Sequence, residues 1–478
     1  MKILVAIANY GTKNAKYLGK LLKEYRSMTK YKADIIVLSN SVKDFGADVE
    51  VIVGLPTQDP YSLPFGYKKI LAERKDKYDI FIYSEDDTLL TEHHIDAFLR
   101  VTKILPDHFI AGFIRYEMSG DGRKHYPDFH GRFHWDPNSV LKIEDHIFAH
   151  HTNEHSACFV LTRRQLISAI DSGGFLLPPR KGRYNMLETA ATDPYTQCGM
   201  EKLICISHLD DFSIHHLPNV YLDKIGIDSE IVDREIDKLK SICECSSICG
   251  PLLDTTTLLN DDHWDKKYYE PGRKDICSLI PANITRVLSI GCGCGSTEFE
   301  IINQGIEVVG IPLDCIIAEE AAARGLKLVP SNFEAAMKRL RCEKFNCILF
   351  LDVLHHLPDP ILVIKTFLNL LPQNDVLIIS VPNFHYPSRR LKRLLGQVGY
   401  SKALCLPNFQ EYKIHFTTKR MLSSWLENCG LEVISSNYYV GPRYEALNRI
   451  TFGWLKSNLS ENIVILARRT PGKDKFQG

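Results

Sequence analysis

Strand-like and helix-like segments alternate along both halves of this 478-residue chain, and this alternation limits what the chain can fold into. It is typical of helices packed around a mostly parallel β-sheet. In the first half, we predict strands at 3–8, 34–38, 49–53 and 79–83, and helices at 13–30 and 65–75. In the second half, we predict strands at 286–290, 307–311, 345–351 and 376–381, and helices at 316–324 and 360–371. Each half is therefore expected to form an α/β domain.

The sequence between the two halves changes in composition from about residue 227 to residue 262. It is first charged and then rich in Ser, Cys and Thr, as in SICECSSICGPLLDTTTLLNDD. We therefore predict domains at 1–226 and 263–468, a linker at 227–262 and a flexible tail at 469–478.

The cysteines of the predicted linker allow two interpretations. Cys243, Cys245 and Cys249 lie close together in the sequence. A structural zinc site needs four ligands, and neither Cys277 nor His263 is supported as the fourth by its spacing. Free thiols are therefore favoured over a zinc site.

The charge balance and the hydropathy pattern exclude several classes of protein. Lys and Arg total 58 and Asp and Glu total 58, so no overall field attracts nucleic acid. The N-terminal MKILVAIANYG runs directly into a predicted strand and lacks the regions of a signal peptide. No apolar run approaches the roughly 18 residues that span a bilayer. We therefore expect a cytoplasmic protein without a transmembrane segment.

The second half contains a glycine-rich turn, which by itself is a weak signal because a dinucleotide fold or a plain tight turn could use the same glycines. Gly291, Cys292, Gly293 and Gly295 follow a predicted buried strand and precede a helix, where glycine lets the backbone pass close to a ligand. The surrounding sequence resembles class I S-adenosylmethionine-dependent methyltransferases from about residue 262 to residue 468, which implies a Rossmann-like domain. The resemblance rests on HWDKKYYEPGRKDICSLIP, VLSIGCGCGSTEFE, VVGIPLD, PSNFE, FNCILFLDVLHHLPDP and LIISVPNF.

This resemblance implies S-adenosyl-L-methionine as the cofactor and a position for several residues around it. The glycine turn would approach the methionine and ribose parts, and Asp352 would face the same crevice. Pro312 occupies the position of the usual ribose-binding carboxylate, so either Asp314 or backbone and water would hold the ribose. Asn332 stands where an Asp often meets the adenine amine, and its carbonyl oxygen can accept that hydrogen bond.

Methyl transfer to an alcohol needs a group that removes a proton, and neutral imidazole serves near pH 7. His355 and His356 follow Asp352 within a turn, and we expect one of them at the lip where the acceptor enters. The alternative is that they cap or pack the helix start. His415 is a weaker candidate. The basic stretch RRLKRLL at 389–395 is expected to be a solvated helix face, with an anionic acceptor or a membrane surface as the alternative.

Three acidic residues end a strand-like segment in the first half, DIFIYSEDD. Glu85 and Asp87 are suited to hold Mg²⁺ or Mn²⁺ against a diphosphate. This half, 1–221, resembles glycosyltransferases of the GT-A type, with EDD in place of the usual DxD motif. The resemblance implies a nucleotide-sugar donor with its base near Ala8 and Asn9, and His215 or His216 completing the metal shell.

Two further groups of side chains belong to this first half. Glu188, Asp193 and Glu201 fall where a base for the acceptor hydroxyl would lie, and we favour Glu188 and Asp193. The histidines of FAHHTNEH, His150, His151 and His155, are interpreted as a polar loop rather than a metal site.

Together these patterns predict a bifunctional enzyme that adds a sugar to a glycan or glycoconjugate and methylates it. Two alternatives remain open. The first half is a non-catalytic carbohydrate-recognition module, or the whole chain is a scaffold whose sites have decayed. Binding of nucleotide sugars and of the methyl-donor product distinguishes these interpretations.

Overall fold

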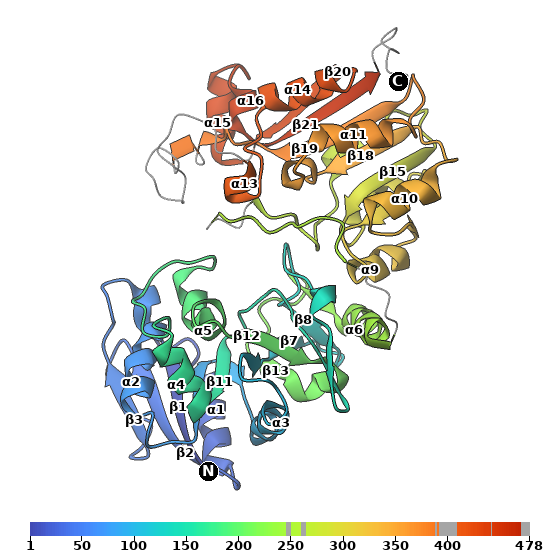
Figure 1. Cartoon of the computed structure of the whole chain (residues 1–478). Coiled ribbons are helices and arrows are strands. Elements are labelled where there is room, and N and C mark those ends of the chain that lie inside the picture. Colours follow the sequence, from blue (N-terminus) through green and yellow to red (C-terminus); the bar gives the residue numbers. More distant parts are fainter. Residues whose placement is uncertain (245–249, 260–263, 388–389, 392–408, 441, 470–478) are drawn as a thin grey trace. The chain divides into compact units, whose positions relative to one another are not determined.

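The computed structural model describes residues 1–244, 250–259, 264–387, 390–391, 409–440 and 442–469 (Figure 1). The chain divides into two compact units, 1–248 and 249–478. Helix α6 (Ser229–Glu244) buries Val232, Ile236 and Leu239 and contacts β8 (Lys124–Tyr126). Residues 227–244 are therefore part of the N-terminal unit, and the predicted linker at 227–262 is corrected accordingly.

A five-stranded sheet forms the centre of the N-terminal unit, in the order β11-β4-β1-β2-β3. The four parallel strands confirm those predicted from the sequence: β1 (Lys2–Asn9), β2 (Lys32–Ser39), β3 (Val49–Val53) and β4 (Ile80–Glu85). The antiparallel edge strand β11 (Cys158–Thr162) pairs with β4. Helices α1 (Ala15–Ser27) and α2 (Tyr67–Glu73) lie within the two predicted helical segments.

Two smaller sheets complete this unit and were not predicted. One has the order β6-β12-β10-β9, and the other has the order β14-β8-β7-β13-β5. Their remaining strands are β5 (Thr88–Leu89), β6 (Phe109–Ala111), β7 (Ile114–Met118), β9 (Leu141–Ile143), β10 (His146–Ala149), β12 (Glu201–Cys205), β13 (Ser213–His216) and β14 (Ile227–Asp228). The helices α3 (Glu92–Thr102), α4 (Arg163–Asp171) and α5 (Met186–Thr196) stand between these strands in the chain. Strands of two to five residues carry too short a hydrophobic pattern to be recognised in sequence.

A seven-stranded sheet forms the C-terminal unit, in the order β17-β16-β15-β18-β19-β21-β20. Five strands are parallel: β15 (Arg286–Cys292), β16 (Glu307–Pro312), β17 (Lys327–Leu328), β18 (Cys347–Leu351) and β19 (Val376–Pro382). The last two strands, β20 (Leu431–Val440) and β21 (Ser460–Arg469), pair with each other in antiparallel orientation. Strand β21 also pairs antiparallel with β19. The strand order reverses at β15, and open parallel sheets bind ligands at the carboxyl ends beside such a point.

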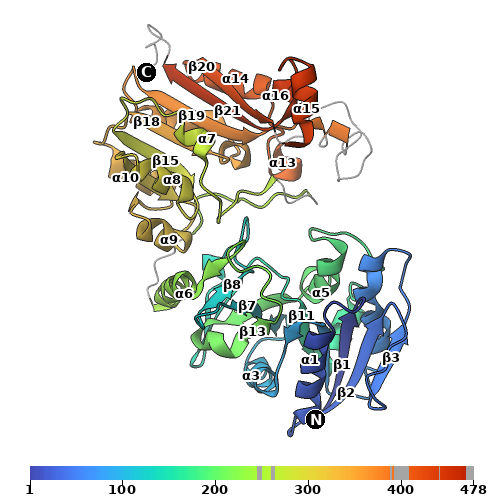
Figure 2. The same cartoon turned by 180° about the vertical axis from the view of Figure 1, so that it is seen from behind.

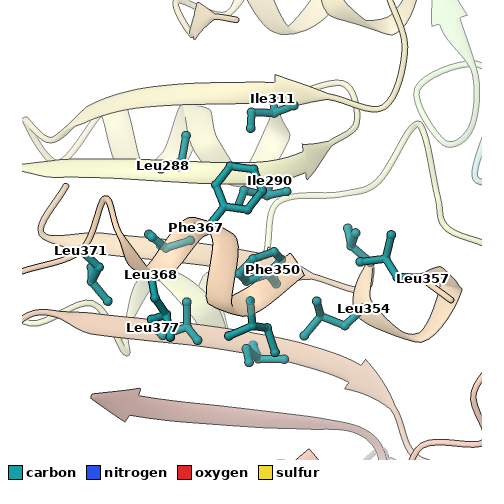
Figure 3. Close-up of a cluster of buried hydrophobic side chains, with 14 of the residues drawn as sticks. Leu288, Ile290, Ile311, Phe350, Leu354, Leu357, Phe367, Leu368, Leu371 and Leu377 are labelled. Carbon is teal, nitrogen blue, oxygen red and sulfur yellow. The ribbon is translucent and has the colours of Figure 1, made fainter. Parts of the chain in front are cut away.

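Helices cover both faces of this sheet (Figures 1 and 2). One face packs against α10 (Phe333–Leu340), α11 (Pro360–Leu368) and α14 (Lys419–Asn428), and the other against α7 (Lys274–Cys277) and α8 (Ser296–Ile302). Figure 3 shows Leu288 and Phe350 of the sheet packed with Phe367 of α11. Burial on both faces explains why the central strands read as continuous apolar runs.

Among the residues that the structure describes, no helix is long and apolar enough to cross a membrane.

Candidate functional site

The glycine turn at the end of β15 lies against a neighbouring stretch of chain. Gly291 has φ +73°, a region that favours glycine. A Cβ on Gly293 would lie 2.2 Å from the carbonyl oxygen of Tyr268, and the N–H of Cys294 donates to that oxygen at 2.8 Å. The turn therefore holds the segment that precedes β15 directly against the carboxyl end of the sheet.

Asp352 lies at the carboxyl end of β18, the strand that pairs with β15. It has φ +55°, and its carboxylate accepts a hydrogen bond from Ser380 Oγ at 2.8 Å. Arg273 Nη1 lies 3.2 Å from the other carboxylate oxygen. Burial would raise the pKa of Asp352, but Arg273 and Lys266 outweigh burial and hold this pKa below its ordinary value. The site therefore presents an anionic carboxylate and a guanidinium side by side.

Two buried charged residues that the sequence analysis did not single out, Lys266 and Glu270, lie next to the carboxyl end of β18. Lys266 Nζ donates to the carbonyl oxygen of Leu351 at 2.9 Å and to Glu270 at 3.0 Å, and both charged side chains are buried. Burial raises the pKa of Glu270. Both residues belong to HWDKKYYEPGRKDICSLIP, residues 263–281, which we call the lead-in segment. Only their spacing of four residues indicates the pair in the sequence.

The structure gives Asp314 and Asn332 local roles. Asp314 is fully buried, and its Oδ1 accepts from the N–H groups of Ile316 and Ile317 at the start of α9 (Ile317–Ala323). Asn332 caps α10, where its side chain accepts from the Ala335 N–H at 3.1 Å. Asp314 Oδ1 and Asn332 Oδ1, both predicted to bind the cofactor, therefore already accept hydrogen bonds from backbone N–H groups of this chain.

A family model and several known proteins match part of this chain, and the residues that the family model matches lie in this unit. A family model described as a methyltransferase domain matches residues 262–436. The ubiquinone biosynthesis O-methyltransferase of Xylella fastidiosa (strain 9a5c) is 29% identical over 184 residues, covering 37% of this chain and 71% of that protein. The enzyme of the same name from Histophilus somni (strain 2336) is 32% identical over 154 residues, covering 27% of this chain and 65% of that protein. A solved S-adenosylmethionine dependent methyltransferase from Mesorhizobium loti is 15% identical and covers 41% of this chain and 96% of that chain, with a TM-score of 0.29.

The C-terminal unit contains a class I S-adenosylmethionine-dependent methyltransferase domain. The family match begins at the boundary of the lead-in segment and includes the glycine turn and Asp352. The part of the sequence prediction that concerned this half is thereby confirmed at the level of fold and enzyme class.

The histidines of the methyltransferase domain differ from their predicted position. His355 and His356 are each only 2% exposed, so neither side chain lies at an open lip. His355 Nε2 lies 3.2 Å from the carbonyl oxygen of Trp264. Burial lowers the pKa of His356 to about 3, and burial lowers that of His355 well below its ordinary value. Both side chains are packed in the short helical turn η5 (Leu354–His356). This agrees with the alternative interpretation, in which the histidines pack the helix start.

His415 is also held within the methyltransferase domain. Its Nε2 lies 2.9 Å from the carbonyl oxygen of Leu357, and burial lowers its pKa. Of the residues considered for zinc, Cys243 lies in the last turn of α6 and Cys277 is buried in α7, while Cys245, Cys249 and His263 lie outside the described residues.

The acidic residues of the N-terminal unit meet the end of β1. Asp86 accepts from Asn9 Nδ2 and from Asn14 Nδ2, the latter at 2.7 Å, and burial raises the pKa of Asp86 to about 6. Asn14 also donates to Asp87 at 2.9 Å. Ala8 and Asn9 are buried at the end of this strand, so Asn9 serves to anchor Asp86.

Glu85, the last residue of β4, and Asp87, in the turn that follows it, each have a histidine neighbour. His155 Nε2 lies 4.0 Å from Glu85, and His216 Nε2 lies 3.7 Å from Asp87. Burial and the neighbouring Asp87 raise the pKa of Glu85 well above its ordinary value. Within the described part of the chain, however, no three His, Cys, Asp or Glu side chains are arranged to hold a metal ion. The residues present thus do not make up a complete metal shell.

The structure also separates His215 from His216. His216 Nδ1 lies 2.7 Å from the buried Glu117, a residue that sequence reasoning missed. His215 stacks on Tyr116 with ring centroids 4.9 Å apart. Since successive side chains of a strand point to opposite faces, only His216 reaches the acidic residues.

Asp193 does not lie where a catalytic base is needed. It is fully buried in α5, forms an ion pair with Lys68, and accepts from Arg180 at 2.6 Å. A carboxylate engaged by two cations and closed to solvent cannot accept a proton from a bound acceptor. The prediction of Asp193 as a base is therefore corrected to a structural role.

Glu188 remains close to the acidic site. Its charge contributes to raising the pKa of Glu85, and burial raises its own pKa. Asn185 Oδ1 accepts from the Glu188 N–H at 3.1 Å and so places it in the first turn of α5. Glu201, the weaker candidate for the base, begins β12 and is exposed.

Proposed function

We propose that the methyltransferase domain binds S-adenosyl-L-methionine beside the Gly291–Gly295 turn and transfers its methyl group to a hydroxyl oxygen of an acceptor, releasing S-adenosylhomocysteine and the hydroxyl proton. The observation that carries this proposal is the Asp352 carboxylate beside the Arg273 guanidinium, at the carboxyl edge of the sheet where the strand order reverses. The similarity to enzymes named ubiquinone biosynthesis O-methyltransferase supports oxygen as the atom methylated.

The side chains at this edge match the chemical groups of the cofactor. An anionic carboxylate and a guanidinium suit the ammonium and carboxylate groups of a methionine moiety. Asp352 would bind the ammonium and Arg273 the carboxylate, while the glycine turn leaves room for the main chain to approach. Because Asp314 Oδ1 caps α9 and Pro312 ends β16, we expect backbone groups to contribute to ribose binding.

The bound cofactor supplies an activated methyl group on sulfur, so this chain has to align the acceptor and exclude water. Lys266 and Glu270 keep the lead-in segment in place by bonding to the end of β18 and to each other. Through these contacts the segment 264–273 would close over the cofactor.

A calorimetric titration with S-adenosylhomocysteine tests this proposal. We expect the full chain to bind, and Asp352→Asn to weaken binding about tenfold or more, since a charged hydrogen bond is worth roughly 1.5–3 kcal/mol. Asparagine tolerates the left-handed backbone of this position, so the fold is retained. Glu432→Gln, at an exposed carboxylate of β20, is the matched control and is expected to bind as the unaltered chain does. Absence of binding to the unaltered chain would refute the proposal.

A second candidate function concerns the N-terminal unit, which we propose transfers a sugar from a nucleotide sugar to a glycan or glycoconjugate, as GT-A-type enzymes do. The supporting observation is the pair of contacts, Glu85 to His155 and Asp87 to His216, at the carboxyl end of β4 next to Asn9. Glu188 is the candidate base. Since the described side chains do not complete a metal shell, no step is assigned to Mn²⁺ or Mg²⁺.

Thermal unfolding of the full chain with a panel of nucleotide sugars, with and without Mn²⁺, tests this second function. We expect one nucleotide sugar to raise the unfolding temperature, because a ligand that binds only the folded state stabilises it. Asp87→Asn should remove that shift, whereas Asp107→Asn, at an exposed ion pair with Arg164, should retain it. Stabilisation by a free sugar alone, unchanged in Asp87→Asn, would instead favour a carbohydrate-recognition module.

A further inference from the structure

The connection between β20 and β21 exposes large apolar side chains. It spans residues 441–459 and carries the helices α15 (Pro442–Ile450) and α16 (Lys456–Leu459). Ile450 is 74% exposed, Phe452 99% and Trp454 87%, and we call these three residues the apolar tip. Hydrophobic side chains gathered in this way mark an interaction surface, whereas single exposed ones do not.

The connection starts from the same edge of the sheet as the candidate methyltransferase site. In the strand register, Pro382 at the carboxyl end of β19 pairs with Asn462, and Val440 pairs with Ser460. Asn383 Nδ2 donates to the carbonyl oxygens of Ser457 and Ser460, at 2.9 and 2.8 Å. The base of the connection is thus fixed, and α15 and α16 lie at that end of β20 and β21 (Figures 1 and 2).

The charges around the apolar tip are mainly positive. Among the described side chains of α15 and α16, Arg449 and Lys456 stand against one carboxylate, Glu445. Arg449 pairs with that carboxylate at 2.7 Å while staying largely exposed. Lys419, at the start of α14, lies over the ring of Tyr438 at the end of β20. Apolar and aromatic side chains bordered by cations match the interface of an anionic bilayer.

The basic stretch near residue 390 meets the same surface. The Tyr386 ring contacts the Tyr444 ring of α15 with centroids 5.4 Å apart, and the Arg390 N–H donates to the carbonyl oxygen of Tyr386. Arg390 and Leu391 are exposed, with Leu391 at 56%. The described part of the RRLKRLL motif therefore adds one more cation and one more apolar side chain beside α15.

We propose that the 441–459 connection docks on an anionic lipid bilayer, with the apolar tip entering the interface and Arg449 and Lys456 pairing with headgroup phosphates. The inference goes beyond the proposed methyl transfer, because docking requires neither cofactor nor acceptor. Its consequence for the enzyme is that the carboxyl edge of the sheet would face an acceptor held at a membrane surface.

Tryptophan emission of the full chain tests the proposal directly. Trp454 is strongly exposed, whereas Trp135, Trp264 and Trp425 are at most 8% exposed, so a change on mixing with vesicles reports on the apolar tip. We expect a blue shift with vesicles of phosphatidylcholine and phosphatidylglycerol at 3:1, and a smaller one with phosphatidylcholine alone or in high salt.

Co-flotation with the same vesicles measures binding in altered chains. The double variant Ile450→Ser/Phe452→Ser is expected to reduce co-flotation about tenfold or more. The reason is that it lacks the two large apolar side chains whose transfer from water into the bilayer would favour binding. Val42→Ser, an 87% exposed residue of the N-terminal unit, should float as the unaltered chain does. Binding of S-adenosylhomocysteine by the double variant would show that the domain is folded, independently of the vesicle result.

Three results would overturn the proposal. The unaltered chain does not float with anionic vesicles, or the double variant floats as well as the unaltered chain does. In the third, light scattering shows a dimer that the double variant loses while vesicle binding is absent, which would assign the apolar tip to a second copy of the chain.

Discussion

Replacing Gly293 with alanine is expected to abolish measurable binding of S-adenosylhomocysteine, with a loss of affinity of about a hundredfold or more. The added Cβ would lie 2.2 Å from the carbonyl oxygen of Tyr268 and 3.1 Å from that of Lys267. Both are backbone atoms, so the lead-in segment would have to move away from the turn and lose the Cys294 to Tyr268 hydrogen bond. Overpacking of this kind costs about 1–3 kcal/mol in stability, and the displaced segment carries Arg273.

Titration calorimetry and denaturant unfolding of the two chains measure this effect. Gly305→Ala is the matched control: Gly305 has φ +83°, and its added Cβ would meet no atom within 4 Å. It is expected to cost about 1 kcal/mol through backbone strain and to leave affinity unchanged. Unaltered affinity in Gly293→Ala would show that the lead-in segment does not form part of the cofactor site.

Replacing Asp193 with asparagine is expected to destabilise the N-terminal unit by about 3–5 kcal/mol. Asp193 is fully buried, and Lys68 is 4% exposed, so the change leaves a buried ammonium without its counter-ion. Lys68 also donates to the carbonyl oxygen of Leu177 at 3.2 Å, which holds the ammonium in place after the carboxylate is gone. Denaturant unfolding followed by circular dichroism measures the loss.

Two further variants distinguish the cost of leaving a buried charge unpaired from the cost of losing an exposed ion pair. Asp48→Asn removes the exposed partner of Arg26 and should destabilise the unit far less than Asp193→Asn does, because water solvates the guanidinium that is left. Lys68→Met/Asp193→Leu should lose less than Asp193→Asn alone, because no unpaired ammonium then stays buried. If Asp193→Asn instead keeps full stability, the carboxylate is not structural, and its role as a base returns to consideration.

Much of the site at the carboxyl edge of the C-terminal sheet follows from local sequence. Gly291 and Gly293 stand at the end of an apolar strand, and Asp352 directly follows another, so parallel pairing brings them to one edge. The roles of Asp314 and Asn332 were harder to assign, because a polar residue at a helix start serves the backbone N–H groups first. That competition is visible only once the start of each helix is known.

Residues close together in sequence were separated by the fold, and distant ones were joined. His215 and His216 alternate across β13, so only one of them reaches Asp87. His155, interpreted as part of a polar loop, lies beside Glu85, seventy positions earlier in the chain. His355 and His356 are buried, and the His355 ring contacts the carbonyl oxygen of Trp264, about ninety positions earlier in the chain.

The sequence by itself determined the two α/β halves, their parallel strands and the glycine turn, because each depends on a local period or on a local backbone requirement. Only the tertiary structure decided which charged groups are buried together, as with Lys68 and Asp193, or Lys266 and Glu270. It also decided that the apolar residues at 450–454 stay exposed, although apolar side chains in sequence normally indicate a core. Burial depends on contacts between distant segments, and no local pattern records which segments those are.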